Sequence, residues 1–275
     1  EICACLVGSE MCIRDSPLYR LADERGCEVV VVPHDARGAL DYDALEAALP
    51  GARLAAVTHA SNLTGDVYDI ARIARLCRER GALLVADAAQ TAGVVSIDMG
   101  RDGLDVVAFT GHKSLYGPQG TGGLAVAEGV EIEPLKVGGS GTHSYDRHHP
   151  ARMPERLEAG TLNAHGIAGL GAGLAYIEER SVEELGAQVR ALAERFERGV
   201  RGIDGVRVLG GGGDAGRCGI VALNVGDADS AAIGDALNAE FGICTRAGAH
   251  CAPLMHEALG TQSPVSYTHL RAHET

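Results

Sequence analysis

Short apolar runs alternate with longer amphipathic segments along most of the chain. The apolar runs predict buried strands at residues 27–33, 52–59, 82–87, 104–109 and 122–127. Between them, residues 42–50 predict a helix that ends at a proline, and 69–81 predict a helix with one apolar face that ends at Gly81. Short apolar strands separated by helices indicate an α/β fold, with a mostly parallel sheet that helices cover on both faces.

The pattern changes near Met153. A second set of elements follows: two long helical segments, a glycine-rich loop, a strand, a helix and a short strand, at 166–180, 181–203, 210–216, 218–225, 230–242 and 243–248. These elements predict a smaller α/β domain that ends early. We therefore expect a large domain at 17–165, followed by connecting helices and a small domain at 166–264.

The two ends of the chain differ from the rest. Residues 1–16 and 265–275 show neither helical nor strand periodicity, and both resemble translated sequencing-adapter read-through. We expect a fragment that runs from about Pro17 to about Pro264 and lacks both natural ends. The first segment contains Cys3, Cys5 and Cys12, whose spacing is not that of a zinc site, so no metal is predicted.

Composition excludes several classes of function. The formal charge of −13 argues against nucleic-acid binding, which needs a basic face, and an aromatic content of 4% without tryptophan argues against base stacking. No apolar run reaches the roughly 20 residues that span a bilayer. A hydrophobic content of 46% is typical of a globular enzyme that binds small molecules.

Three successive strands end in polar groups, at the edge where an open parallel sheet binds its ligands. The strand endings are THASN, DAAQ and TGHK, and they contain His59 and Asn62, then Asp87 and Gln90, then Thr110, His112 and Lys113. Each residue alone has an ordinary explanation: aspartate caps helices, asparagine forms turns, and a loop lysine is usually solvated. Their occurrence together, in this order, favours a binding site.

Pyridoxal phosphate is the cofactor whose chemistry needs this set. It needs a lysine, here Lys113, to bind its aldehyde as a Schiff base, and a carboxylate, here Asp87, beside the pyridine nitrogen. Side-chain amides can donate to the ring oxygen, and a hydroxyl and an imidazole can contact the phosphate; these are Asn62 and Gln90, and Thr110 and His112. We expect Lys113 to be desolvated, and the glycines after it to let the backbone approach the cofactor.

Nucleotide-binding alternatives fit the sequence less well. The segment GHKS has His112 where a phosphate-binding loop needs glycine. The segment GLGAGL at 169–174 does not follow a strand, so we interpret its glycines as points of close helix packing. No glycine-rich turn follows the first strand, which argues against a nicotinamide dehydrogenase.

The segments HASNLTG, VADAAQ, TGHKSLYGPQGTGG, RLEAGTLN and RAGAHCAP together resemble the class V aminotransferase superfamily of fold-type I pyridoxal-phosphate enzymes. They most resemble its cysteine desulfurase and selenocysteine lyase branch, from about Pro17 to about Thr261. The resemblance implies the fold-type I transferase fold and the roles given above to Lys113, Asp87, Gln90 and Asn62. It also implies that Thr161, in EAGT, reaches the phosphate of a neighbouring subunit, and hence a homodimer.

Cys251 distinguishes a desulfurase from a plain aminotransferase of the superfamily, which needs no such residue. Its glycine, histidine and proline neighbours in RAGAHCAPLMH predict a loop, where a thiolate can attack sulfur, rather than a buried structural thiol. The resemblance implies that L-cysteine or L-selenocysteine is the substrate, that Lys113 removes its α-proton, and that Cys251 takes the sulfur as a persulfide before an acceptor receives it. His112 could stack near the ring or transfer protons, and the sequence leaves both open.

The other cysteines and histidines receive structural interpretations. We expect structural thiols at Cys27, Cys77, Cys218 and Cys244, and loop residues bordering the active-site entrance at His143, His148 and His149. The five cysteines after residue 17 are scattered and odd in number, and the chain lacks a secretion signal. That pattern is typical of the reducing cytoplasm.

The chain also departs from the family pattern. The family's Gly-Thr-Thr phosphate segment and ring-stacking histidine would precede Pro17, and its carboxylate-binding arginine would follow the HCA motif, a role we do not assign to Arg271. We therefore expect an impaired site. Two alternatives to a desulfurase stay open: another class V aminotransferase or lyase, which would tolerate loss of Cys251, and an inactive fragment that binds no cofactor.

Overall fold

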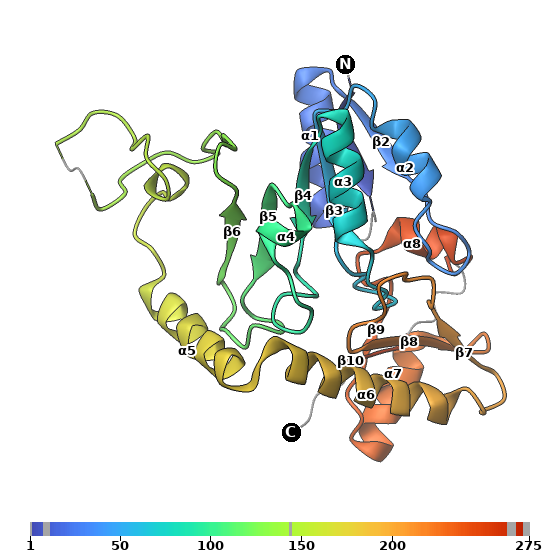
Figure 1. Ribbon diagram of the computed structural model, residues 1–275. Coiled ribbons are helices and arrows are strands. Elements are labelled where there is room, and N and C mark those ends of the chain that lie inside the picture. The colour runs from blue at the N-terminus through green and yellow to red at the C-terminus, as the bar shows by residue number, and fades with distance from the viewer. Residues whose placement is uncertain (1, 8–11, 143–144, 263–267, 272–275) are drawn as a thin grey trace.

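Two β-sheets joined by a pair of helices form the protein (Figure 1). The computed structural model describes residues 2–7, 12–142, 145–262 and 268–271. The larger sheet has the strand order β2-β1-β3-β4-β5-β6. Its strands are β1 (Ile2–Val7), β2 (Glu28–Val32), β3 (Leu54–Thr58), β4 (Leu83–Asp87), β5 (Val106–Thr110) and β6 (Gly122–Val126). All neighbours pair in parallel except β5 and β6, which are antiparallel.

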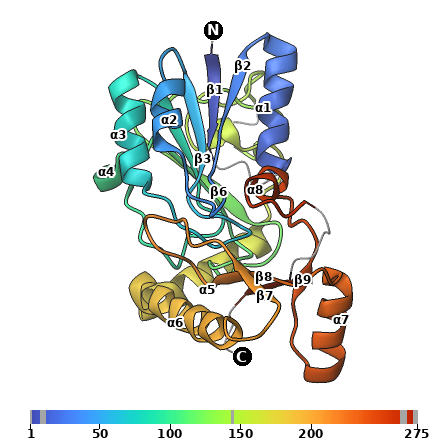
Figure 2. The ribbon, with the colours of Figure 1, turned by 90° about the vertical axis from the view of Figure 1, so that its right-hand side faces the viewer.

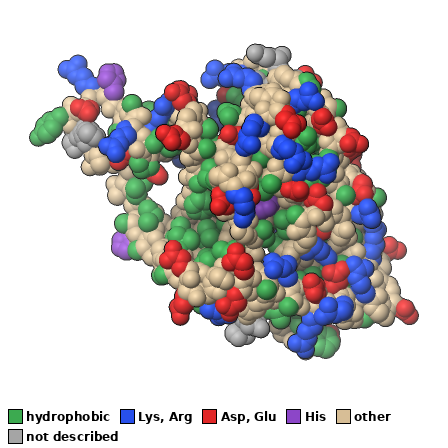
Figure 3. Space-filling model, viewed as in Figure 1, with side chains coloured by type: hydrophobic (Ala, Val, Ile, Leu, Met, Phe, Trp, Pro, Cys, Tyr) green, Lys and Arg blue, Asp and Glu red, His purple; other side chains and the backbone are tan. Residues whose placement is uncertain are grey.

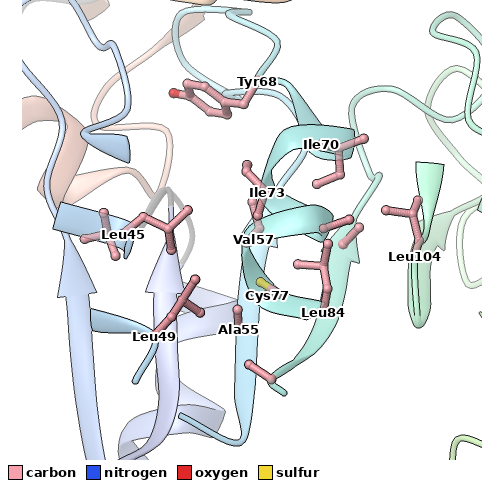
Figure 4. Close-up of a cluster of buried hydrophobic side chains, with 14 of the residues drawn as sticks. Leu45, Leu49, Ala55, Val57, Tyr68, Ile70, Ile73, Cys77, Leu84 and Leu104 are labelled. Carbon is pink, nitrogen blue, oxygen red and sulfur yellow. The ribbon is translucent and has the colours of Figure 1, made fainter. Parts of the chain in front are cut away.

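Helices cover both faces of this sheet (Figure 2). On one face, α2 (Tyr42–Ala48), its C-cap Leu49 and α3 (Ile70–Arg80) contribute Leu45, Leu49, Ile73 and Cys77 to the main core (Figure 4). In this layer α2 contacts β1 and β2, and α3 contacts β4. On the other face, Leu18 of α1 (Cys12–Arg25) packs against Ala56. Since β3 is buried on both faces, it reads as a continuous apolar run, as the sequence predicted for a parallel sheet.

The second sheet has the order β7-β8-β10-β9 and its strands pair antiparallel. Its strands are β7 (Val206–Leu209), β8 (Ile220–Val225), β9 (Arg246–Ala247) and β10 (Thr268–Arg271). The long helices α5 (Ala164–Arg180) and α6 (Val182–Val200) connect the two sheets. Helix α7 (Ser230–Phe241) packs on β9 and β10, and α8 (Pro253–Ala258) lies between the two sheets. Among the described residues, no helix is both long and apolar enough to cross a membrane.

Regular structure extends into both terminal segments. Although residues 1–16 show neither helical nor strand periodicity, β1 lies inside the larger sheet between β2 and β3, and α1 begins at Cys12. Within 265–275, Thr268–Arg271 forms β10 between β8 and β9. The short elements α4 (Met99–Asp102), η1 (Glu155–Leu157), β7 and α8 were also not predicted. The domain boundaries at 17–165 and 166–264 stay a prediction.

Glycines on α5 let this helix pack closely against the loop after Lys113, as the sequence predicted for GLGAGL. A Cβ added at Gly173 would lie 2.3 Å from the Leu115 carbonyl oxygen, and one at Gly169 would lie 3.2 Å from Pro118. By contrast, a Cβ at Gly171 would meet nothing within 4 Å. The positions of Gly169 and Gly173 therefore determine which face of α5 packs against the loop.

We expect Gly173→Ala to destabilise the protein and Gly171→Ala, on the same helix, to stabilise it. The first adds a methyl group against backbone, which costs about 1–3 kcal/mol, and the second removes a flexible residue from a helix interior, which stabilises by about 0.5–1 kcal/mol. Urea unfolding of the two variants measures both free energies. Equal effects of the two substitutions would contradict the close packing of α5 on this loop.

The segment between β6 and α5 projects away from both sheets (Figure 1). His149 stabilises it, because its Nε2 lies 3.0 Å from the Arg156 carbonyl oxygen and its Nδ1 lies 3.2 Å from that of Gly138. His148 and His149 lie in this segment, so the expectation that they are loop residues is confirmed, whereas their place at the entrance to the site stays a prediction. His143 lies outside the described residues.

Candidate functional site

The carboxyl ends of β3, β4 and β5 meet at one edge of the larger sheet, because these strands are parallel neighbours. Hydrogen bonds continue the sheet past the strand ends: the His59 amide donates to the Asp87 carbonyl at 2.9 Å, and the Ala88 amide donates to Ala108 at 2.8 Å. The Asp87 carboxylate accepts from the Ala89 amide at 2.9 Å and is half-buried. Asp87 therefore sits at this edge in a fixed turn, followed by a half-buried Gln90.

Lys113 follows β5 in a tight loop. The loop is closed by the Tyr116 amide, which donates to the Lys113 carbonyl at 3.1 Å, and by the Gly117 amide, which donates to Gly111 at 2.8 Å. Lys113 is half-buried, as expected for a lysine partly removed from water. Upstream, Thr110 Oγ1 and His112 Nδ1 lie 2.8 Å apart, so these two predicted phosphate contacts bond to each other.

The glycines of this loop allow neighbouring elements to pack closely against it. A Cβ at Gly117 would lie 2.8 Å from Leu170 Cδ1, and one at Gly122 would lie 2.6 Å from the Phe109 carbonyl oxygen. At Gly123 a Cβ would lie 2.8 Å from the Phe109 ring. These glycines make room for α5 and for β5, and so hold the lysine loop in place. That the loop also lets the backbone approach a cofactor stays a prediction.

Asn62 connects the edge of the larger sheet to the loop that contains Cys251. It is 7% exposed, and its Nδ2 donates to the His250 carbonyl at 2.8 Å, across 188 positions of sequence. Cys251, the next residue, is exposed, as the sequence predicted. Both His250 and Cys251 have positive φ, 52° and 59°, a conformation that costs energy for residues with a side chain. The bond from Asn62 helps to hold this turn beside the end of β3.

A buried ionic cluster, which sequence reasoning missed, supports the loop containing Asn62. Asp66 is fully buried; its carboxylate accepts from the amides of Gly211 and Gly212 and lies 3.6 Å from Arg217 Nε. Arg217 also donates to the Thr64 carbonyl. Burial raises the pKa of Asp66, and Arg217 opposes that shift. The cluster anchors residues 61–66 to the glycine-rich loop before β8.

His59 lies directly beneath this edge and is 4% exposed. Its Nδ1 is 2.9 Å from Thr91 Oγ1, and burial lowers the pKa of His59 to about 4. The folded protein therefore keeps this imidazole neutral at pH values where an unfolded chain would protonate it.

We expect His59 to reduce stability in mild acid. Below its ordinary pKa of 6.5 the unfolded chain binds a proton, whereas the folded chain does so only below about 4, so stability falls as the pH falls through this interval. Between pH 7.5 and 4.5 the loss amounts to about 2–3 kcal/mol. Urea unfolding at the two pH values should show a smaller loss in His59→Asn, which keeps a polar group near Thr91 but does not titrate. An equal loss in both proteins would contradict this account.

The remaining cysteines follow the predictions in part. All five cysteines after residue 17 are free thiols, and Cys27, Cys77 and Cys218 are buried, as predicted. Cys244 is exposed, so its interpretation as a structural thiol is wrong; its Sγ lies 3.7 Å from Asn238 Oδ1 in the turn after α7. Within the described ranges, no group of three or more histidine, cysteine or acidic side chains could hold a metal ion.

The chain is similar to known proteins along most of its length. A family model described as aminotransferase class-V matches residues 13–272. A probable cysteine desulfurase from Methanothermobacter thermautotrophicus is 37% identical over 256 residues, which cover 89% of this chain and 63% of that protein. A probable cysteine desulfurase from Pyrococcus abyssi is 34% identical, over 87% of this chain and 60% of its own length.

A solved structure has the same fold. The apo structure of a cysteine desulfurase from Thermococcus onnurineus matches 99% of this chain and 68% of its own length, with a TM-score of 0.86 and 28% identity. The chain spans about three fifths of the length of the curated relatives that it matches. Because the family model covers nearly all of its residues, the chain belongs to the class-V aminotransferase family.

Proposed function

We propose that this edge of the larger sheet binds pyridoxal phosphate. The donor set supports it, since a carboxylate, Asp87, and an amine, Lys113, stand at the ends of adjacent parallel strands, each in a loop closed by backbone hydrogen bonds. Asp87 would hold the pyridine nitrogen and Lys113 the aldehyde, while Gln90 and Asn62 would serve the ring oxygen. The bound cofactor would supply an electron sink for an amino-acid substrate.

Thr110, His112 and Thr161 complete the proposed set. Thr110 and His112 already form one hydrogen-bonded unit at the end of β5, which would present a hydroxyl and an imidazole to the phosphate. Thr161 is exposed where the projecting segment meets α5, and its partner would be the phosphate of a second subunit.

The proposed homodimer has support in the exposed apolar side chains of this region. In Figure 3, hydrophobic side chains gather in the hollow between the projecting segment and the rest of the molecule. Exposed apolar residues lie on β6, on the projecting segment and on α5: Leu124, Leu135, Val137, Leu162 and Ile167. Monomers rarely leave such a surface uncovered.

The proposed reaction is desulfuration of L-cysteine. One observation carries it: the hydrogen bond from Asn62 to His250, which fixes the loop of an exposed cysteine beside the strand ends that carry the proposed cofactor residues. Lys113 Nζ would take the α-proton of the substrate. Cys251 Sγ, as a thiolate, would attack the substrate sulfur, so that an S–S bond forms as the carbon–sulfur bond breaks. The β-carbon would keep the electron pair of the broken bond and take up the proton of the substrate thiol, and Lys113 would return a proton to the α-carbon. The three-carbon remainder would then leave as alanine, and Cys251 would retain the sulfur as a persulfide for an acceptor.

The test is to incubate the chain with pyridoxal phosphate and L-cysteine. We expect alanine to form, more slowly than in an enzyme that has the family's carboxylate-binding arginine, together with a persulfide on Cys251 that mass spectrometry of the peptide 247–258 detects. An alternative class V reaction would produce a keto acid or another product without modifying Cys251.

A further inference from the structure

Helix α8 directs a buried histidine back at the Cys251 loop. His256 is 3% exposed, its Nε2 lies 3.0 Å from the Ala249 carbonyl oxygen, and its Nδ1 lies 3.0 Å from Thr261 Oγ1. The Ala249 carbonyl also accepts from the Ala252 amide at 2.9 Å, which closes the turn containing His250 and Cys251. One side chain thus holds the start of this turn from inside the protein.

The hydrogen bonds fix the tautomer of His256. A carbonyl oxygen only accepts, so Nε2 carries the proton and donates to Ala249, and Nδ1 accepts from the Thr261 hydroxyl. Burial lowers the pKa of His256, which favours this neutral form. The ring is therefore an oriented donor aimed at a single backbone oxygen.

The turn needs such support because its conformation is strained. Positive φ at two successive residues with side chains is unfavourable at each, and persists only where the surroundings impose it. Asn62 holds the carbonyl of His250 from the larger sheet, and His256 holds the carbonyl of Ala249 from α8. The two bonds act on adjacent peptide groups directly before Cys251.

We propose that His256 is a positioning residue for Cys251: its Nε2–H bond to Ala249 holds the turn in the conformation that presents the thiol. Its effect on sulfur transfer rests on the proposed desulfuration, whereas its effect on the turn does not. No chemical step passes through the imidazole.

Three variants test this proposal in the full chain. His256→Gln retains an amide that can reach Ala249 in place of Nε2, and His256→Leu retains bulk without a donor. Leu209→Ala is the matched control: Leu209 belongs to the same apolar cluster as Met255 and Leu259 but lies on β7, outside the turn. The control therefore lowers stability without removing the bond.

The direct measurement is hydrogen exchange of the peptide 249–256. We expect exchange in the turn to be about tenfold faster in His256→Leu, because one buried hydrogen bond is lost, and within about threefold of the parent in His256→Gln. With L-cysteine and pyridoxal phosphate, persulfide formation on Cys251 should fall about tenfold in His256→Leu, with cofactor affinity unchanged, and recover in His256→Gln.

The outcomes separate the two proposals. Faster exchange that Leu209→Ala reproduces, or that His256→Gln does not rescue, would overturn the positioning role. If the exchange results are as expected but the parent forms no persulfide, the positioning role stands and the proposed desulfuration is wrong. Normal persulfide formation in His256→Leu would overturn the link between the turn and sulfur transfer.

Discussion

Replacing Lys113 with alanine should abolish covalent binding of pyridoxal phosphate. The parent chain, incubated with the cofactor, should acquire a visible absorption band from the Schiff base, and Lys113→Ala should show only free cofactor. The physical reason is that the bond needs a primary amine, and the loop after β5 presents a half-buried lysine at the edge of the sheet. The expected effect is complete loss of the band.

The sequence offers an unusually clean control, because it contains two lysines, Lys113 and Lys136. Lys136 is exposed on the projecting segment, so Lys136→Ala should keep the band. Borohydride reduction followed by peptide mapping should place the label on Lys113. A label on Lys136 or on the chain's amino terminus, or a band that persists in Lys113→Ala, would overturn the assignment of the cofactor lysine.

The strand-and-helix order could be read from the sequence because the larger sheet is mostly parallel and buried. Runs such as LAAVT in β3 contain no polar interruption, and Asp69 and Gly81 mark the ends of α3 by an N-cap bond and a left-handed C-cap. The capping signals are local, so local reasoning finds them. The segment ICACLV also is an apolar run, and its place in β1 depends on pairing with β2 and β3, which lie far along the chain.

The candidate site likewise contains residues that the sequence pattern could place and contacts that it could not. Asp87 and Lys113 follow their strands directly, so the pattern that predicts parallel strands also brings these residues to one edge. The Asn62–His250 bond, the Asp66–Arg217 cluster and the His256–Ala249 bond depend on how the two sheets meet or on how the chain folds back. No periodicity encodes such contacts. The loop glycines show a related limit: the sequence indicates that other groups pack closely against the loop, and the structure shows that Leu170 of α5 and Phe109 of β5 do so.

The second large effect concerns Cys251. We expect Cys251→Ala to lower alanine release from L-cysteine by at least about a hundredfold, because the substitution removes the exposed thiol whose loop Asn62 holds beside the strand ends. Cofactor binding should be unchanged, since the Asn62 bond goes to the backbone of His250 and not to the thiol. The measurement is alanine release per bound cofactor.

Cys244→Ala is the matched control, because Cys244 is the other exposed thiol among the cysteines after residue 17 and lies near the turn after α7. This variant should retain the activity of the parent and leave the persulfide on Cys251. If Cys251→Ala released alanine at the parental rate, the thiol would have no part in the chemistry, and another class V reaction would replace desulfuration. If Cys244→Ala were the inactive variant, the thiol that takes the sulfur would be the one before β9 and not the one after it, and the Asn62 bond would have no part in positioning that thiol.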